Sequence, residues 1–122
     1  MNKYVKIGAI AAMLSVAIGA FGAHMLENRI SADDLDVYKT GVQYQMFHSI
    51  GILFIAILLE RMPANKPALW AARLLTIGIV LFSGSLYVLA LSGVKVLGAI
   101  TPIGGVAFIA GWISLAFAAR RK

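Results

Sequence analysis

The sequence contains no cysteine, which excludes a disulfide framework, a thiol nucleophile and thiolate metal sites. Acidic residues number only five and histidines two. No zinc motif, phosphate-binding loop, dinucleotide fingerprint or nucleophile–base pair is present. We therefore expect a protein that is not an enzyme and that needs no metal and no cofactor.

Charge is also scarce: 13% of the 122 residues are charged and 61% are hydrophobic, with a mean hydropathy of +0.87. A soluble domain is about half apolar and about a quarter charged, so this chain lacks the polar residues to cover a water-facing surface. The net charge is +6, but the basic residues lie in short segments between apolar runs. This distribution is typical of membrane-helix flanks and not of a nucleic-acid interface, so the expected partner is the lipid bilayer.

Four apolar runs are long enough to cross the hydrocarbon layer, which takes about 20 helical residues. They cover residues 4–25, 42–60, 69–91 and 102–119. Lipid offers no partners to bare peptide groups, so each span should be helical, and the alternating pattern of barrel strands is missing. The sequence predicts an all-α, single-domain, integral membrane four-helix bundle with up-down-up-down topology.

Local signals mark the start of the second helix. Ser31 followed by Asp34 resembles a capping box, which predicts that this helix begins outside the membrane. Residues 31–41 would then form an interfacial helix start, with an apolar stripe lying on the membrane surface.

Other signals mark the end of the third helix and the start of the fourth. Gly93 should end the third helix, and Thr101 should cap the fourth, with Pro102 at its first position. Residues 94–100 are apolar but too few to span, so we expect a buried loop or a segment that dips into the bilayer.

The basic residues predict the orientation. One side of the membrane would carry Lys3, Lys6, Arg61, Lys66, Arg73, Arg120, Arg121 and Lys122. The other would carry Arg29, Lys39 and Lys95 together with Glu27, Asp33, Asp34 and Asp36. Basic residues are retained in the cytoplasm, so we expect a multi-pass protein of the cell (plasma or inner) membrane with both termini cytoplasmic.

An alternative interpretation is a secretory signal cleaved near Gly22, which would leave three spans. The first apolar run is long for a signal core, and it carries small residues that a discarded peptide would not need. These features favour an uncleaved first span.

Small residues recur at three- and four-residue spacing along two of the spans. They are Gly8, Ala12, Ser15 and Gly19 in the first span, and Gly104, Ala107, Gly111 and Ser114 in the fourth. Small residues allow membrane helices to approach closely, so these faces are predicted to pack within a tight bundle or between its copies.

Strongly polar residues inside a span are costly and mark candidate sites. The predicted polar cluster comprises His24, Gln43, Tyr44, Gln45, His48, Ser49, Ser83, Ser85 and Tyr87. Gln45, His48 and Ser49 share one helix face by their spacing. If the first two spans are neighbours, His24 and His48 should lie in the same half of the membrane.

Three roles are open to this cluster. The leading one is an interhelical hydrogen-bond cluster that fixes the register of the helices. A second is a proton or ion path that uses His48. A third is a redox site, in which two histidines hold a haem or one pairs with a quinone oxygen.

Four blocks resemble the signatures of a known membrane family. They are Gly19-Ala-Phe-Gly-Ala-His24, Val42-Gln-Tyr-Gln-Met-Phe-His48, Phe82-Ser-Gly-Ser-Leu-Tyr87 and Leu97-Gly-Ala-Ile-Thr-Pro-Ile-Gly-Gly105. In this order they resemble the domain of unknown function 423, which includes the animal transmembrane protein 256. The resemblance covers nearly the whole chain and implies a multi-pass inner or plasma membrane protein, but no activity. Met25 departs from the glycine that many members carry.

These observations favour a non-enzymatic membrane protein that acts through helix packing, as an accessory or lipid-organising element. Its protein partners would be further copies of itself or other membrane proteins. An alternative is a small oligomeric transporter or channel that uses the polar cluster around His48. Small multidrug transporters have a similar length, but their membrane-embedded acid is missing from this first span. A haem- or quinone-binding redox subunit is the third alternative.

Overall fold

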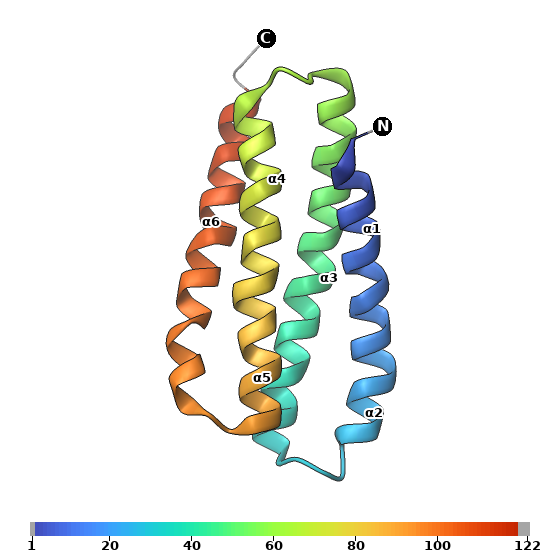
Figure 1. Ribbon diagram of the computed structural model, residues 1–122, viewed down its shortest axis with the longest axis vertical. Coiled ribbons are helices and arrows are strands. Elements are labelled where there is room, and N and C mark those ends of the chain that lie inside the picture. The colour runs from blue at the N-terminus through green and yellow to red at the C-terminus, as the bar shows by residue number, and fades with distance from the viewer. Residues whose placement is uncertain (1, 120–122) are drawn as a thin grey trace.

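The computed structural model describes residues 2–119, apart from the side chain of Ala23. Its described residues form four long antiparallel rods joined by short turns (Figure 1). The elements are α1 (Lys3–Val16), the π-helical η1 (Ala17–Gly22), α2 (Ala23–Leu26), α3 (Ala32–Arg61), α4 (Lys66–Gly78), the π-helical η2 (Ile79–Ser83), α5 (Gly84–Ser92), the 3₁₀-helical η3 (Lys95–Ala99) and α6 (Thr101–Ala118).

Each rod is long and apolar enough to cross a membrane. The candidate spans are Lys3–Leu26, Ala32–Arg61, Lys66–Ser92 and Lys95–Ala118. The prediction of four apolar, membrane-spanning helices is therefore confirmed. Met1 and the basic residues Arg120, Arg121 and Lys122, which contribute to the orientation argument, lie outside the described residues.

The second rod starts where its cap predicts, and its first turns continue directly into the rest of the helix. Ser31 Oγ accepts a hydrogen bond from the Asp34 amide at 3.0 Å, so the capping prediction is confirmed. Residues 32–41, which we expect at the membrane interface, form the first turns of α3, and α3 runs on without interruption for 30 residues (Figure 1). Tyr38 is buried, and its hydroxyl donates to Ile18 O at 2.6 Å. This contact packs the start of α3 against the first rod.

The turn between the third and fourth rods corrects two predictions. Gly93 ends α5 in the left-handed conformation, with φ of 72°, as expected. Residues 94–100 form no buried loop, because η3 sits at the end of the molecule with no covering segment and is largely exposed. Thr101 is the first residue of α6 and not its cap. Its hydroxyl instead pairs with Ser85 Oγ at 2.6 Å.

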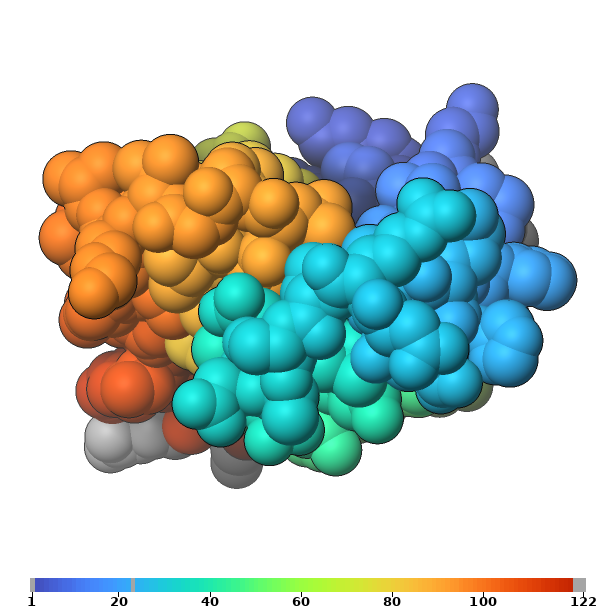
Figure 2. Space-filling view, turned by 90° about the horizontal axis from the view of Figure 1, so that it is seen from below, coloured from blue at the N-terminus to red at the C-terminus, as the bar shows by residue number. Residues whose placement is uncertain are grey.

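The rods pack in a row, with α3 and the third rod, formed by α4, η2 and α5, as the two inner rods. The most extensive contacts join α1 to α3, α3 to α4 and α5, and α4 to α6. Seen from the end that carries the 27–31 turn and η3, the molecule is broader in one direction than in the other (Figure 2). The first and fourth rods thus lie toward opposite sides, and α3 meets α6 mainly through side chains.

Small residues occupy the tightest contacts between the rods. A Cβ on Gly8 would lie 2.8 Å from Leu53, and one on Gly19 would lie 2.8 Å from Val42. A Cβ on Gly104 would lie 2.7 Å from Phe82 Cα, which is backbone and cannot give way. Gly111 lies against Leu75 in the same manner.

The remaining small residues also lie at contacts. Ser15 and Ala107 are buried and Ala12 is half-buried, while Ser114 Oγ donates to Pro67 O at 2.7 Å across the α4–α6 contact.

Candidate functional site

Gln45 is the centre of a buried polar network that joins three rods. Its Nε2 donates to Ala11 O in α1 at 2.8 Å, and its Oε1 accepts from the Tyr87 hydroxyl in α5 at 2.6 Å. Ser49, one turn further along α3, donates its hydroxyl to Gln45 O. One buried amide therefore fixes the position of the first and third rods against the second.

Further hydroxyl groups extend this network toward the end of the bundle that carries the 27–31 turn. Ser83, at the end of η2, donates to Gly41 O at 2.7 Å. Tyr38 donates to Ile18 O within η1, and its ring packs at a tilt against the Tyr87 ring, with ring centroids 5.4 Å apart. Each π-helical segment thus makes one hydrogen bond with α3, through the Ser83 hydroxyl in η2 and through the Ile18 carbonyl in η1. Such segments displace backbone groups from the regular α-helical ladder and recur at functional positions.

No buried side-chain nitrogen or oxygen within the described residues lacks a hydrogen-bond partner. In hydrocarbon, polar groups that find partners within the protein stabilise helix association, and each such bond contributes about 0.6 kcal/mol on average. Each buried side-chain nitrogen and oxygen of the network around Gln45 therefore has at least one hydrogen-bond partner within the described residues.

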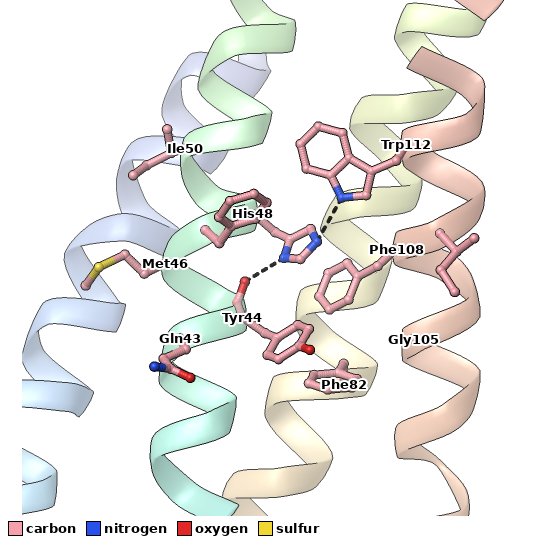
Figure 3. A pocket seen from close by; sticks show the side chains of 11 residues that line it. Gln43, Tyr44, Met46, His48, Ile50, Phe82, Gly105, Phe108 and Trp112 are labelled. Atoms are coloured by element: carbon pink, nitrogen blue, oxygen red, sulfur yellow. Dashed lines mark hydrogen bonds between the residues drawn. The ribbon is translucent and has the colours of Figure 1, made fainter. Parts of the chain in front are cut away.

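His48 belongs to a different environment, between α3 and α6 (Figure 3). Its Nδ1 lies 2.7 Å from Tyr44 O, and its Nε2 accepts from the Trp112 indole at 3.0 Å. A carbonyl only accepts and an indole N–H only donates. The ring is therefore neutral, with its proton on Nδ1, and both nitrogens are in use.

Aromatic rings surround this pair and line a groove, which we call the α3–α6 groove. Phe108 stacks on His48 with ring centroids 3.6 Å apart, and Tyr44 lies 4.5 Å from Phe82 by the same measure. The groove has a volume of about 880 Å³, and its ring-bearing lining residues are Tyr44, Phe47, His48, Phe82, Phe108 and Trp112. This volume lies within the range of small-molecule sites, about 300–1,000 Å³.

Two polar side chains of the predicted cluster lie at this groove and outside the buried network. Gln43 and Tyr44 are both exposed and line the groove (Figure 3). Within residues 2–119, neither the Gln43 amide group nor the Tyr44 hydroxyl has a hydrogen-bond partner among the protein's own groups. These are the free polar groups that the groove offers.

His24 lies apart from the other members of the predicted polar cluster. It is exposed in α2. Gly22 lies against Tyr38, and His48 is ten residues further along α3, about 15 Å at 1.5 Å per residue. The antiparallel register thus carries His24 away from His48. Ser85 also lies apart, paired with Thr101 at the start of α6.

Sequence reasoning missed the residues that α6 brings to the site. Trp112 and Phe108 were not singled out, although they hold His48 in place. The available signal was a lone indole in the middle of a span, where its N–H requires a partner. In the structure, that partner is His48 Nε2.

The comparisons with known proteins identify the family. The sequence model of the family DUF423 matches residues 18–105. The description of this family is 'protein of unknown function'. The chain belongs to this family.

Curated members of the family are similar over most of their length. The UPF0382 membrane protein YwdK of Bacillus subtilis is 48% identical over 119 residues, which cover 98% of this chain and 97% of YwdK. A UPF0382 membrane protein of Haemophilus influenzae is 47% identical over 116 residues, 95% of this chain and 92% of that protein. The UPF0382 inner membrane protein YgdD of Escherichia coli is 44% identical over 104 residues, 85% of this chain and 79% of YgdD.

No solved structure matches the chain. The sequence relatives establish that this DUF423 chain is a multi-pass protein of the cell membrane, and the predicted resemblance to the family is confirmed.

Proposed function

We propose that this DUF423 protein is a non-enzymatic accessory protein of the membrane, which acts by packing beside lipids or other membrane components. The observation that carries the proposal is the completeness of the network around Gln45, in which every described buried polar group has a partner. Such a network fixes the register of the helices. Its buried side-chain groups are engaged in hydrogen bonds between the helices and within α3.

The geometry gives little support to transport through a single copy. A proton path needs groups that exchange partners along the membrane normal. His48 is instead fixed between Tyr44 O and the Trp112 indole. The groove beside it opens sideways between α3 and α6 and not along the bundle axis (Figure 3).

Haem ligation is disfavoured on similar grounds. An axial histidine needs a free nitrogen lone pair, and the Nε2 lone pair of His48 already accepts the indole hydrogen. His24 lies too far along the first rod to act as a second ligand.

The proposed orientation places both termini in the cytoplasm. Its support is the excess of basic residues near the 62–65 turn and in the terminal segments. The opposite end carries the 27–31 turn and η3, close to Asp33, Asp34 and Asp36.

A flux assay in sealed liposomes tests the proposed function. Purified protein is reconstituted, and proton and small-ion movement is followed with trapped dyes, with gramicidin as the positive control. We expect rates equal to those of empty liposomes. Flux that is present in the parent, lost in His48→Ala and retained in the control variant Ser114→Ala would overturn the proposal in favour of a His48-dependent transporter.

A further inference from the structure

The α3–α6 groove has a polar mouth and an apolar body. Gln43 and Tyr44 lie at the end nearer the 27–31 turn, and Trp112 lies at the other (Figure 3). Along α3 the lining runs from Gln43 to Ile50, seven residues or about 10 Å at 1.5 Å per residue. The groove therefore extends about 10 Å along the axis of α3.

The body of the groove presents hydrocarbon and ring faces. Phe47, Ile109 and Phe108 line it, and the polar atoms of His48 and Trp112 are already paired with each other. An occupant of this part gains nothing from hydrogen bonding. An apolar chain suits it because each methylene only has to match the surrounding side chains.

The mouth requires the opposite chemistry. The amide of Gln43 and the hydroxyl of Tyr44 are unpartnered donors within the described chain, and they face a low-dielectric medium in which an unpaired polar group is costly. Lys39 lies one turn further out on the same helix and is exposed; together with Gln43 it lines a second, smaller hollow beside α1. Acceptor oxygens above an apolar tail match the donors at this mouth. A negative group on the same occupant would find Lys39 in the adjoining hollow, which shares Gln43 and Met46 with the groove.

We propose that the α3–α6 groove binds one acyl chain of a glycerophospholipid from the leaflet next to the 27–31 turn. The ester carbonyl oxygens would accept from Gln43 and Tyr44, and the phosphate would lie toward Lys39. Four residues separate Lys39 from Gln43, about 6 Å along the helix. This order of a cation, then donors, then an apolar channel follows the order of phosphate, ester and chain in the lipid.

A second copy of the chain fits the groove less well. In a two-fold contact each copy presents the same surface, so that residue i of one copy meets residue j of the other and the reverse. The groove lining contains no acidic side chain, so a second copy that presented this surface would bring no anionic partner for Lys39. The assignment goes beyond the proposed function, and it would survive a finding of solute flux.

Tryptophan quenching tests this site. The chain has two tryptophans, so Trp70→Phe leaves Trp112 as the sole reporter within the groove. The protein is placed in phosphatidylethanolamine vesicles that contain either a phosphatidylethanolamine brominated on one acyl chain or a brominated alkane at the same mole fraction. The alkane carries no acceptor oxygens. We expect the brominated lipid to quench Trp112 at least twice as strongly as the alkane.

Two variants with a matched control locate the effect. Gly105 lines the groove, and a Cβ there meets only the Phe82 ring at 3.8 Å, so Gly105→Leu should fill the groove without disturbing the backbone. Gly84→Leu is the control, because a Cβ on Gly84 meets nothing within 4 Å and Gly84 is not among the groove lining. The excess quenching by the lipid should at least halve in Gly105→Leu and stay unchanged in Gly84→Leu. A double variant, Gln43→Leu with Tyr44→Phe, should abolish the preference for lipid over alkane.

Native mass spectrometry of the parent, released gently from its membrane, gives the second readout. One phospholipid retained per chain, and lost in Gly105→Leu, is the expected result. Equal quenching by lipid and alkane would overturn the proposal. So would a retained quinone, a retained partner protein or a dimer that excludes lipid from Trp112.

Discussion

Replacing Gln45 tests whether the buried network holds the rods in register. Leucine has nearly the volume of glutamine but no polar atoms, so Gln45→Leu removes both interhelical bonds, to Ala11 O and from the Tyr87 hydroxyl. It also leaves the hydroxyl of the half-buried Tyr87 without this partner. Gln43→Leu is the matched control, because Gln43 lies two residues away on an exposed part of α3.

The expected cost follows from the bonds that are lost. Two interhelical hydrogen bonds contribute about 1 kcal/mol together, at an average of about 0.6 kcal/mol each. An unpaired buried hydroxyl costs about 1–3 kcal/mol more. We therefore expect Gln45→Leu to lower the free energy of unfolding by about 2–4 kcal/mol, and Gln43→Leu to change it by less than about 0.5 kcal/mol.

A double-mutant cycle isolates the bond between Gln45 and Tyr87. The free energies of unfolding of Gln45→Leu, Tyr87→Phe and the double variant are measured in mixed micelles by titration with SDS. We expect a coupling energy of about 1 kcal/mol, because the two side chains touch directly. A coupling indistinguishable from zero, or a Gln45→Leu variant as stable as Gln43→Leu, would refute the role assigned to the network.

Two further predictions concern packing and topology. Gly104→Ala should lower the free energy of unfolding by about 1–3 kcal/mol, because its Cβ would meet the Phe82 backbone, whereas its neighbour Gly105→Ala should be nearly neutral; equal SDS midpoints for the two variants would contradict this. Because the chain has no cysteine, single-cysteine variants report the topology: an impermeant maleimide should label Asn28→Cys but not Ala64→Cys in intact cells, and the reverse result would invert the proposed orientation.

The number and boundaries of the helices could be predicted because the bilayer sets them. A hydrocarbon layer about 30 Å thick requires about 20 apolar residues per span. Each span is therefore visible in the sequence as a continuous run of apolar residues. The cap at Ser31 and the end at Gly93 were also predictable, because each depends on local backbone chemistry. The π-helical segments η1 and η2 carry no comparable local signal.

The site could be predicted only within each helix. Three- and four-residue spacing brings Gln45, His48 and Ser49 onto neighbouring positions of α3, and all three are buried. Their partners depend on how the rods are aligned with one another. The bonds from Gln45 to Ala11 and from Trp112 to His48 join residues 34 and 64 positions apart. No rule of helical spacing reaches across such distances.

The position of His24 depends on the same alignment. From the sequence, two histidines on neighbouring spans could be placed only in the same half of the membrane. The contact of Gly22 with Tyr38 fixes the register and leaves His24 beyond the end of the network. The Tyr38 hydroxyl donates to Ile18 O and holds this register.

The polar residues of α3 divide into two groups with different consequences. Gln45 and Ser49 point into the protein, where every bond is made within the chain. Gln43 and Tyr44 border the lipid, where the chain provides them with no partner. If both groups served helix packing alone, the polar groups of Gln43 and Tyr44 would lie in hydrocarbon with no interaction to offset the unfavourable free energy of placing them there. A bound acceptor from the membrane removes that cost, which is why the fixed interior and the open groove together favour a protein that holds a lipid in place.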